Sequence, residues 1–235
     1  MRLGALIGVV AMGLVVAADE RGTDLANAYR VEFENAWVRV TRVVYEPRQK
    51  LPAHTHTPLA SAYIYLNDGP AVRYSHIGDH NIVATRPPTR AGAFRVFRGI
   101  DEIHEAENLG DTPSHFLRVE FKTEMQDESR FTARIAPPAA TTTTQAGLEF
   151  DHPLTRITRL RIAAGAALEV DSALPSLLVA FAPAAIVWDG APAPVTLETG
   201  QTRWVAAGAG RALRNAGHTA AHLLRLEFKT PPAAR

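Results

Sequence analysis

The stretch KLPAHTHTPLASAYIYLNDG, residues 50–69, decides how the rest of the chain is interpreted. Its second half is mostly apolar, contains Tyr and Ile, and ends at Asn-Asp-Gly, a pattern that predicts a strand followed by a turn. His54 and His56 stand two positions apart, so on a strand both side chains point to one face and can share one metal ion. His104, in GIDEIHEAENLG, is a candidate for a third ligand.

The composition is that of a globular protein without a charge bias. The chain has 235 residues, 46% hydrophobic and 21% charged. Its 25 Lys and Arg against 24 Asp and Glu leave a net charge of +1, which gives no reason to expect nucleic acid or an anionic membrane as a partner. There is no cysteine, so disulfides, thiolate ligands and thiol catalysis are excluded. Any metal must therefore be held by His and carboxylates.

Residues 1–18 are expected to be a secretory signal peptide. Arg2 supplies a positive charge, residues 3–16 are apolar, and the small residues Ala17 and Ala18 provide a cleavage site. The apolar run is shorter than the roughly 20 residues that a membrane span needs. We therefore expect a periplasmic or secreted protein with no membrane contact after cleavage; an uncleaved anchor is the alternative.

The rest of the chain repeats itself. Two segments recur 117 positions later, and one recurs 107 positions later. The matching segments are VEFE at 31–34 with LEFD at 148–151, RVTRV at 39–43 with RITRL at 156–160, and HFLRVEFKT at 115–123 with HLLRLEFKT at 222–230. Repeats of this length indicate two similar domains, because the units of solenoids are shorter.

The linker between the two copies is predicted at residues 136–147, which are rich in Pro, Ala and Thr. The expected domains are therefore residues 30–135 and residues 148–230. Both contain short apolar segments separated by turn signals such as Asn-Asp-Gly, and a helical pattern is found only near residues 124–130. Many short strands with regular turns predict an all-β sandwich or barrel.

These residues resemble the two motifs of the cupin superfamily. The first motif has a Gly, His-x-His, a Glu and a closing Gly; the second has a Gly, Pro-x-Gly, a His and an Asn. The positions that match are His54, His56 and Gly69 for the first motif, and Gly92, His104 and Asn108 for the second. The resemblance covers about residues 30–125 and 146–230. It implies an all-β bicupin of two tandem double-stranded β-helix (cupin, jelly-roll) barrels.

The first copy departs from the family pattern at two positions. Arg48 stands where the first Gly belongs, and no Glu follows His56. The fourth protein ligand of the family is therefore missing. Other side chains near the motifs are alternatives for this fourth ligand, namely Glu102, Glu105, His76 and His80.

The second copy keeps the turn residues of the motifs and loses the histidines. Asp171, Ala173 and Arg211 occupy the three His positions, whereas Gly165, Gly200, Gly208 and Asn215 are retained. We therefore expect a degenerate second cupin without metal ligands. Because a buried charge needs a partner, we predict an ion pair between Asp171 and Arg211 inside the second barrel.

The resemblance implies that His54, His56 and His104 bind one divalent metal ion. Three neutral imidazoles leave the charge of the ion uncompensated and coordination positions open for water, dioxygen or substrate. Nitrogen ligands suit Fe, Zn, Cu, Ni and, less well, Mn. A polar cluster of histidines that holds no metal is the alternative interpretation.

Other residues are candidates for contacts with a substrate. Tyr63 and Glu102 are the candidate catalytic residues, with core packing as the alternative role of Tyr63. Arg95 and Arg98 either bind an acidic substrate or form solvated strand edges. His115 and His222 occupy equivalent positions in the two copies, which favours a structural role.

Two classes of function follow. The first is an exported metal-dependent oxygenase or isomerase that acts on a small molecule in the first barrel. The second is a non-catalytic bicupin that binds a small ligand or a metal. The fold does not decide between them, because cupins have many functions. Homodimer formation stays open as well.

Overall fold

The computed structural model describes residues 20–78, 81–123, 127, 130–232, and side chains from residue 24 onward. Apart from one helix, the named elements in this part of the chain are strands. The N-terminal half contains α1 (Glu20–Ala28), β1 (Tyr29–Glu34), β2 (Val38–Tyr45), β3 (Lys50–Thr55), β4 (Ser61–Tyr65), β5 (Val72–Ile77), β6 (Val83–Arg86), β7 (Phe94–Phe97), β8 (Ile103–Asn108), β9 (Ser114–Phe121) and β10 (Thr132–Ile135). The C-terminal half contains β11 (Gln145–Asp151), β12 (Thr155–Ile162), β13 (Ala167–Glu169), β14 (Ser176–Ala180), β15 (Ala184–Trp188), β16 (Val195–Leu197), β17 (Thr202–Val205), β18 (Ala212–Asn215) and β19 (Ala221–Phe228).

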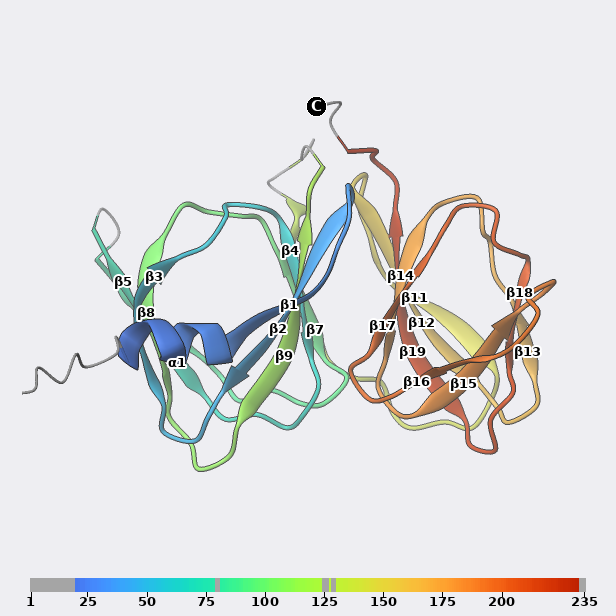
Figure 1. Cartoon of the computed structure of the whole chain (residues 1–235), viewed down its shortest axis with the longest axis horizontal. Helices are drawn as coiled ribbons and strands as arrows, with labels where there is room; N and C mark the ends of the chain where they lie inside the picture. Colours follow the sequence, from blue (N-terminus) through green and yellow to red (C-terminus); the bar gives the residue numbers. More distant parts are fainter. Residues whose placement is uncertain (1–19, 79–80, 124–126, 128–129, 233–235) are drawn as a thin grey trace, which may run out of the picture.

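Each half forms a barrel from two antiparallel sheets (Figure 1). The first barrel has a sheet of order β1-β2-β9-β4-β7-β10 opposite a sheet of order β3-β8-β5-β6. The second has β11-β12-β19-β14-β17 opposite β13-β18-β15-β16. The two barrels share this topology up to β17, which is the counterpart of β7. The expectation of an all-β chain with two tandem jelly-roll barrels is confirmed.

The strand pairing preserves the offsets seen in the sequence. Leu51 pairs with Ala106 between β3 and β8, and Leu168 pairs with Leu213 between β13 and β18. These positions differ by the same 117 and 107 residues as the sequence repeats. The two copies are therefore equivalent residue by residue around the motif positions.

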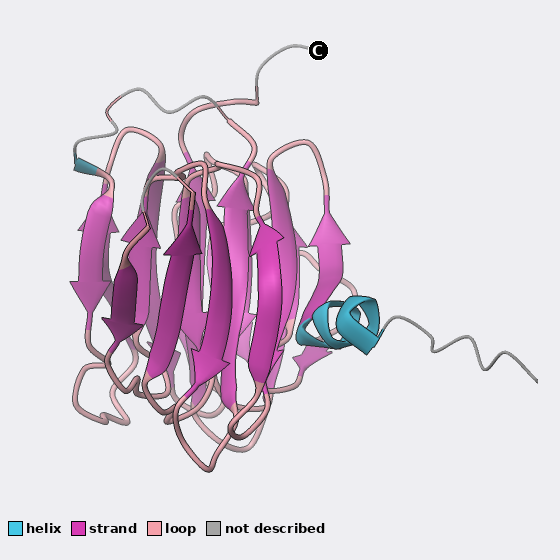
Figure 2. Ribbon diagram, turned by 90° about the vertical axis from the view of Figure 1, so that its left-hand side faces the viewer, coloured by secondary structure: helices cyan, strands magenta, loops and turns pink. Residues whose placement is uncertain are grey.

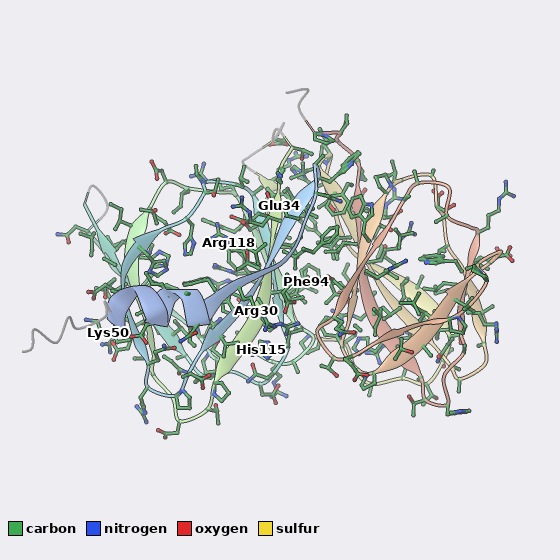
Figure 3. The ribbon with its side chains drawn as sticks, viewed as in Figure 1. Arg30, Glu34, Lys50, Phe94, His115 and Arg118 are labelled. Carbon is green, nitrogen blue, oxygen red and sulfur yellow. The ribbon has the colours of Figure 1, made fainter. Side chains whose placement is uncertain are left out.

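The barrels pack against each other through the outer faces of their larger sheets. Alternate residues of β2, β4, β7 and β9 form one continuous apolar cluster with residues of β12, β14 and β19. Phe94, for example, lies on the side of the first barrel that faces the second (Figure 3). Both faces of these two sheets are thus covered, one by the neighbouring barrel and one by the interior of its own barrel.

An equivalent arginine from each barrel crosses this interface. Arg42 donates to the carbonyl oxygen of Gly200 at 2.8 Å, and Arg159 donates to that of Gly92, also at 2.8 Å. Each guanidinium also contacts a histidine Nε2 of its own barrel, His115 at 2.7 Å for Arg42 and His222 at 3.1 Å for Arg159. The expected structural role of the two histidines is confirmed, because they belong to this pseudo-symmetric contact.

Gly200 shows why this contact needs a glycine. Its φ is +77°, a conformation that L residues rarely adopt. A Cβ atom there would lie 2.6 Å from Cδ1 of Leu66 and 2.9 Å from a nitrogen of Arg42. Gly200 therefore serves both the turn and the approach of the two barrels.

The turn at the missing motif glycine is nevertheless kept. Arg48 has φ +59°, close to the +72° of its counterpart Gly165. A non-glycine residue in this region costs about 1–2 kcal/mol. Arg48 is also held by two hydrogen bonds to the Asp111 carboxylate, at 2.7 and 3.0 Å.

The structure corrects two expectations about the chain ends and the linker. The sequence pattern did not predict α1, which lies beside β2 and β3 at the edge of the first barrel (Figure 2). The linker is shorter than the predicted residues 136–147, because residues 145–147 belong to β11 and pair with β12. The signal peptide, residues 1–18, and most of the helical pattern at 124–130 lie outside the described residues. No helix of the described chain is long and apolar enough to cross a membrane.

We predict that Arg159→Gln lowers the free energy of unfolding by about 3 kcal/mol, because it leaves the carboxylate of Glu149 without its partner. The Arg159 side chain is 3% exposed and lies 2.7 Å from Glu149. Arg156→Gln is the matched control on the same strand, since the Arg156–Asp151 pair is exposed and should contribute less than about 1 kcal/mol. Urea unfolding of both variants measures the difference; equal losses would contradict the proposed importance of the interface.

His222 should make stability depend on pH. Burial, together with the charges of Arg159 and Arg161, lowers the pKa of His222 to about 4. The unfolded chain, with a pKa of about 6.5, then binds more protons than the folded one between these values. The stabilisation is therefore complete above pH 6.5 and is lost as the pH falls toward 4. His222→Gln should flatten the pH dependence of the midpoint of urea unfolding in this window, and an unchanged slope would contradict this assignment.

Candidate metal centre

Three histidines from two distant segments meet in the first barrel. His54 lies on β3 and faces His104 on the neighbouring strand β8, while His56 follows directly after β3. One nitrogen of each lies within 4.8 Å of the others. The predicted trio is therefore brought together, and these three nitrogens are the ones that would hold one ion.

The hydrogen bonds of His54 define its tautomer. Nδ1 lies 2.8 Å from the carbonyl oxygen of Pro52, which can only accept, so Nδ1 carries the proton. Burial lowers the pKa of His54, which favours the neutral ring with a free electron pair on Nε2. The hydroxyl of Tyr29 donates to this Nε2 at 2.8 Å and lies 2.7 Å from the hydroxyl of Tyr45. His54 thus offers the nitrogen form that a metal ion requires.

The other two histidines also have nitrogens that are available to bind a cation. Burial and the nearby charge of Arg118 lower the pKa of His56 to about 2. The His104 side chain is buried, and its Nε2 has no hydrogen-bond partner among the described residues. A buried nitrogen without a partner is rare in native proteins. A metal ion would satisfy this nitrogen, so the donor set fits the expected ion.

Glu102 is placed to orient His104. Its two carboxylate oxygens lie 3.4 Å from Nδ1 of His104 and 3.1 Å from Nδ1 of His76. Burial works to raise the pKa of Glu102, but the contact with His104 and the nearby His76 lower it overall, so the carboxylate is ionised at neutral pH. A carboxylate behind a metal-binding histidine fixes the ring and raises its basicity.

The structure places three of the four alternatives for a further ligand. His76 and Glu102 form a second possible trio with His104, with ligand atoms within 4.8 Å of one another. Glu105 instead faces the outer side of β8, where it pairs with Lys50 at 2.8 Å. His80 lies outside the described residues.

A cavity of about 230 Å³ adjoins the histidines. Both candidate catalytic residues, Tyr63 and Glu102, line it, together with His56, His76 and His104. Arg118 lies within the barrel on the opposite sheet (Figure 3). The two candidate substrate-binding arginines differ, since Arg95 lines the cavity whereas Arg98 is exposed. The alternative of a solvated strand edge is therefore wrong for Arg95.

The second barrel has a filled interior at the equivalent place. Leu160, Ile162, Leu178, Leu213 and Leu223 are buried in its core. They stand where the first barrel has Val43, Tyr45, Tyr63, Ala106 and Phe116, four of which line the cavity. At three of these five positions Leu or Ile has thus replaced Tyr or Phe, and the three histidine positions are changed as well.

The predicted ion pair of this second barrel is wrong. Asp171 and Arg211 are both exposed, and no ion pair joins them. Asp171 instead accepts a hydrogen bond from its neighbour Ala173 at 2.9 Å. The prediction assumed that both charges are buried, and water removes the need for a partner.

Of the four tyrosines that line the cavity, the sequence patterns singled out Tyr63 alone. Tyr29, Tyr45 and Tyr74 line the cavity together with Tyr63, and Tyr29 reaches the histidines from the first position of β1, directly after α1. A signal was present, because all five tyrosines of the chain lie in the first copy. Tyrosines concentrated in the copy that keeps the histidines indicate a polar, aromatic interior there.

The comparisons with known proteins concern the fold. No protein-family model and no curated protein matches the sequence. Similar solved structures include AerE from Microcystis aeruginosa (12% identity, 86% of this chain and 97% of that chain, TM-score 0.57). Others are YhaK from Escherichia coli (10%, 86% and 91%, TM-score 0.58) and a G106A mutant of salicylate 1,2-dioxygenase from Pseudoaminobacter salicylatoxidans in complex with gentisate (13%, 86% and 74%, TM-score 0.56). At such identities the likeness carries no residue roles.

We predict that Glu102→Gln weakens metal binding by roughly 10–100-fold, because the neutral amide no longer raises the basicity of His104. Glu105→Gln, which lies one residue past the predicted ligand His104 and faces outward, is the matched control and should leave the affinity unchanged. Competition with a chromophoric chelator measures both. Equal affinities of the two variants would show that Glu102 does not support the site.

Proposed function

We propose that this chain, a two-barrel cupin by fold, binds one divalent metal ion through His54, His56 and His104 and uses it to convert a small molecule by oxygenation or isomerisation. One observation carries the proposal: three imidazoles lie together beside a cavity, and the buried Nε2 of His104 has no hydrogen-bond partner in the part of the chain that the structure describes. Oxygenation is the first candidate by fold analogy, since one structural neighbour is a dioxygenase.

The ion would supply a Lewis acid with positions open to substrate, because neutral imidazoles do not compensate its charge. Iron, zinc, copper, nickel and manganese all fit nitrogen ligands to different degrees. The residues of the chain would do the rest. Glu102 is ionised and can accept a proton from a group in the cavity, while the phenol of Tyr63 can donate one.

The second barrel supports this function through packing alone. It has no histidine at the positions equivalent to His54, His56 and His104, and its interior is filled by aliphatic side chains. Its larger sheet covers the outer face of the sheet that carries Tyr63, Arg95 and Arg118. One wall of the cavity is thereby held by apolar contacts on its far side.

A non-catalytic metal- or ligand-binding protein is the second candidate. The observation that favours it is the hydrogen bond from Tyr29 to Nε2 of His54, which engages the electron pair that this histidine would offer to a metal ion. The missing Glu after His56 is consistent with such a site. Turnover of a bound compound would decide in favour of the enzyme.

We also propose that the protein is exported and that residues 1–18 are removed. The support is the sequence itself, with one positive charge, an apolar run and small residues before Asp19. Sequencing the N-terminus of protein isolated from its cells tests this, and a chain that still begins at Met1 would contradict it.

The metal assignment is tested by elemental analysis of purified protein. Wild type should contain a single equivalent of a divalent metal, and His54→Ala/His56→Ala should lose nearly all of it, because one imidazole cannot hold the ion. Asp171→Ala, at the equivalent position of the second barrel, is the control and should keep the wild-type content. Equal metal content in wild type and the double variant would remove the proposed function.

A further inference from the structure

A row of large side chains crosses the cavity wall opposite the histidines. Arg118 on β9, Tyr63 on β4, Arg95 on β7 and Arg134 on β10 lie directly opposite one another on neighbouring strands. Residues paired in this way project from the same face of a sheet. All four line the cavity whose other wall carries the histidines.

The charge of Arg118 is compensated by the protein. Its guanidinium lies 3.3 Å from Glu120 and donates to the carbonyl oxygen of Thr57 at 3.2 Å. The second barrel repeats this arrangement with Arg225, which lies 3.5 Å from Glu227. Because the second barrel keeps these contacts although aliphatic side chains fill its core at the equivalent place, their role is structural.

Arg95 is not compensated in this way. No carboxylate of the described chain lies within ion-pairing distance, and its buried Nε has no hydrogen-bond partner there. The guanidinium instead lies 4.1 Å from the ring centroid of Tyr63. Buried cations without an acidic partner are rare, because desolvation of the charge is expensive. Its counterpart in the second barrel, Arg203, faces Leu178 in the strand pairing and is exposed.

The other charges around the cavity add to the demand for an anion. Its lining contains four arginines, Arg86, Arg95, Arg118 and Arg134, against one carboxylate, that of Glu102. A bound metal ion would increase this excess. The planar guanidinium of Arg95 favours a carboxylate among anions, because an arginine binds a planar carboxylate side-on through paired N–H groups.

We infer that the cavity binds a small carboxylic acid whose carboxylate is held by Arg95, with the rest of the molecule directed toward the histidines. This rests on the proposed function, for which it names the substrate class. The cavity volume of about 230 Å³ is below that of pockets for drug-sized ligands. Phe97 and Phe116 in its lining suit a compound with an aromatic ring, of the size of benzoate.

The test measures binding of benzoate and benzamide to protein freed of metal with a chelator, by ligand-observed NMR titration. The two probes have the same shape and differ in charge. Wild type should bind benzoate more tightly than benzamide by roughly tenfold or more, the usual contribution of a hydrogen bond to a charged group. Arg95→Gln should abolish this preference, and Arg203→Gln, the same change at the equivalent position, should keep it.

Equal binding of the two probes by wild type, or benzoate binding by Arg95→Gln that matches wild type, would overturn the inference. The comparison of probes on wild type needs no variant, so it holds even if Arg95→Gln unfolds. Arg95→Lys retains the charge without the paired donors and should show an intermediate preference. Because the protein is metal-free throughout, a failure of the metal proposal leaves these outcomes unchanged.

Discussion

The pairing of β3 with β8 is the constraint on which the site depends. It sets His54 directly opposite His104, although fifty residues separate them in the chain. The register shifts between Leu51 and His54, so the two histidines are brought level at the very end of the strand. A slip of one residue would turn one imidazole to the outer face of the sheet, because side chains alternate along a strand.

Comparison of the two barrels shows that the site reduces the stability of the first barrel and that the second barrel can offset this loss. The first barrel keeps tyrosines, arginines and histidines in its interior, which pack less well than aliphatic side chains and must be desolvated. The second barrel has the same topology up to β17 and an aliphatic interior. The continuous apolar cluster between the barrels joins the two, so the well-packed copy can stabilise the copy that carries the polar cavity. The second barrel thus contributes a well-packed core, while the first barrel carries the polar cavity.

The contacts between the barrels follow the same duplication. Arg42 and Arg159 descend from one position, and each reaches the backbone at the motif glycine region of the other barrel. Neither contact is visible in one copy alone, since the acceptor lies in the other. The repeated Arg, His and Glu residues in the sequence are the trace of this pseudo-symmetric interface.

The sequence by itself determined the repeat and the all-β class, because these depend on recurring segments, turn residues and side-chain alternation. The two tandem barrels and the trio of His54, His56 and His104 followed from the resemblance to the cupin motifs. The sequence also contained the replacement of each histidine in the second copy. Only the tertiary structure placed Tyr29 on His54, Glu102 behind His104 and Arg95 out of ion-pairing reach of the carboxylates that it describes, and it overturned the ion pair of Asp171 and Arg211. The physical reason is that burial and the choice of partners depend on which distant strands meet. A charged side chain costs little free energy in water, and it requires a partner or a ligand only where the fold removes the water.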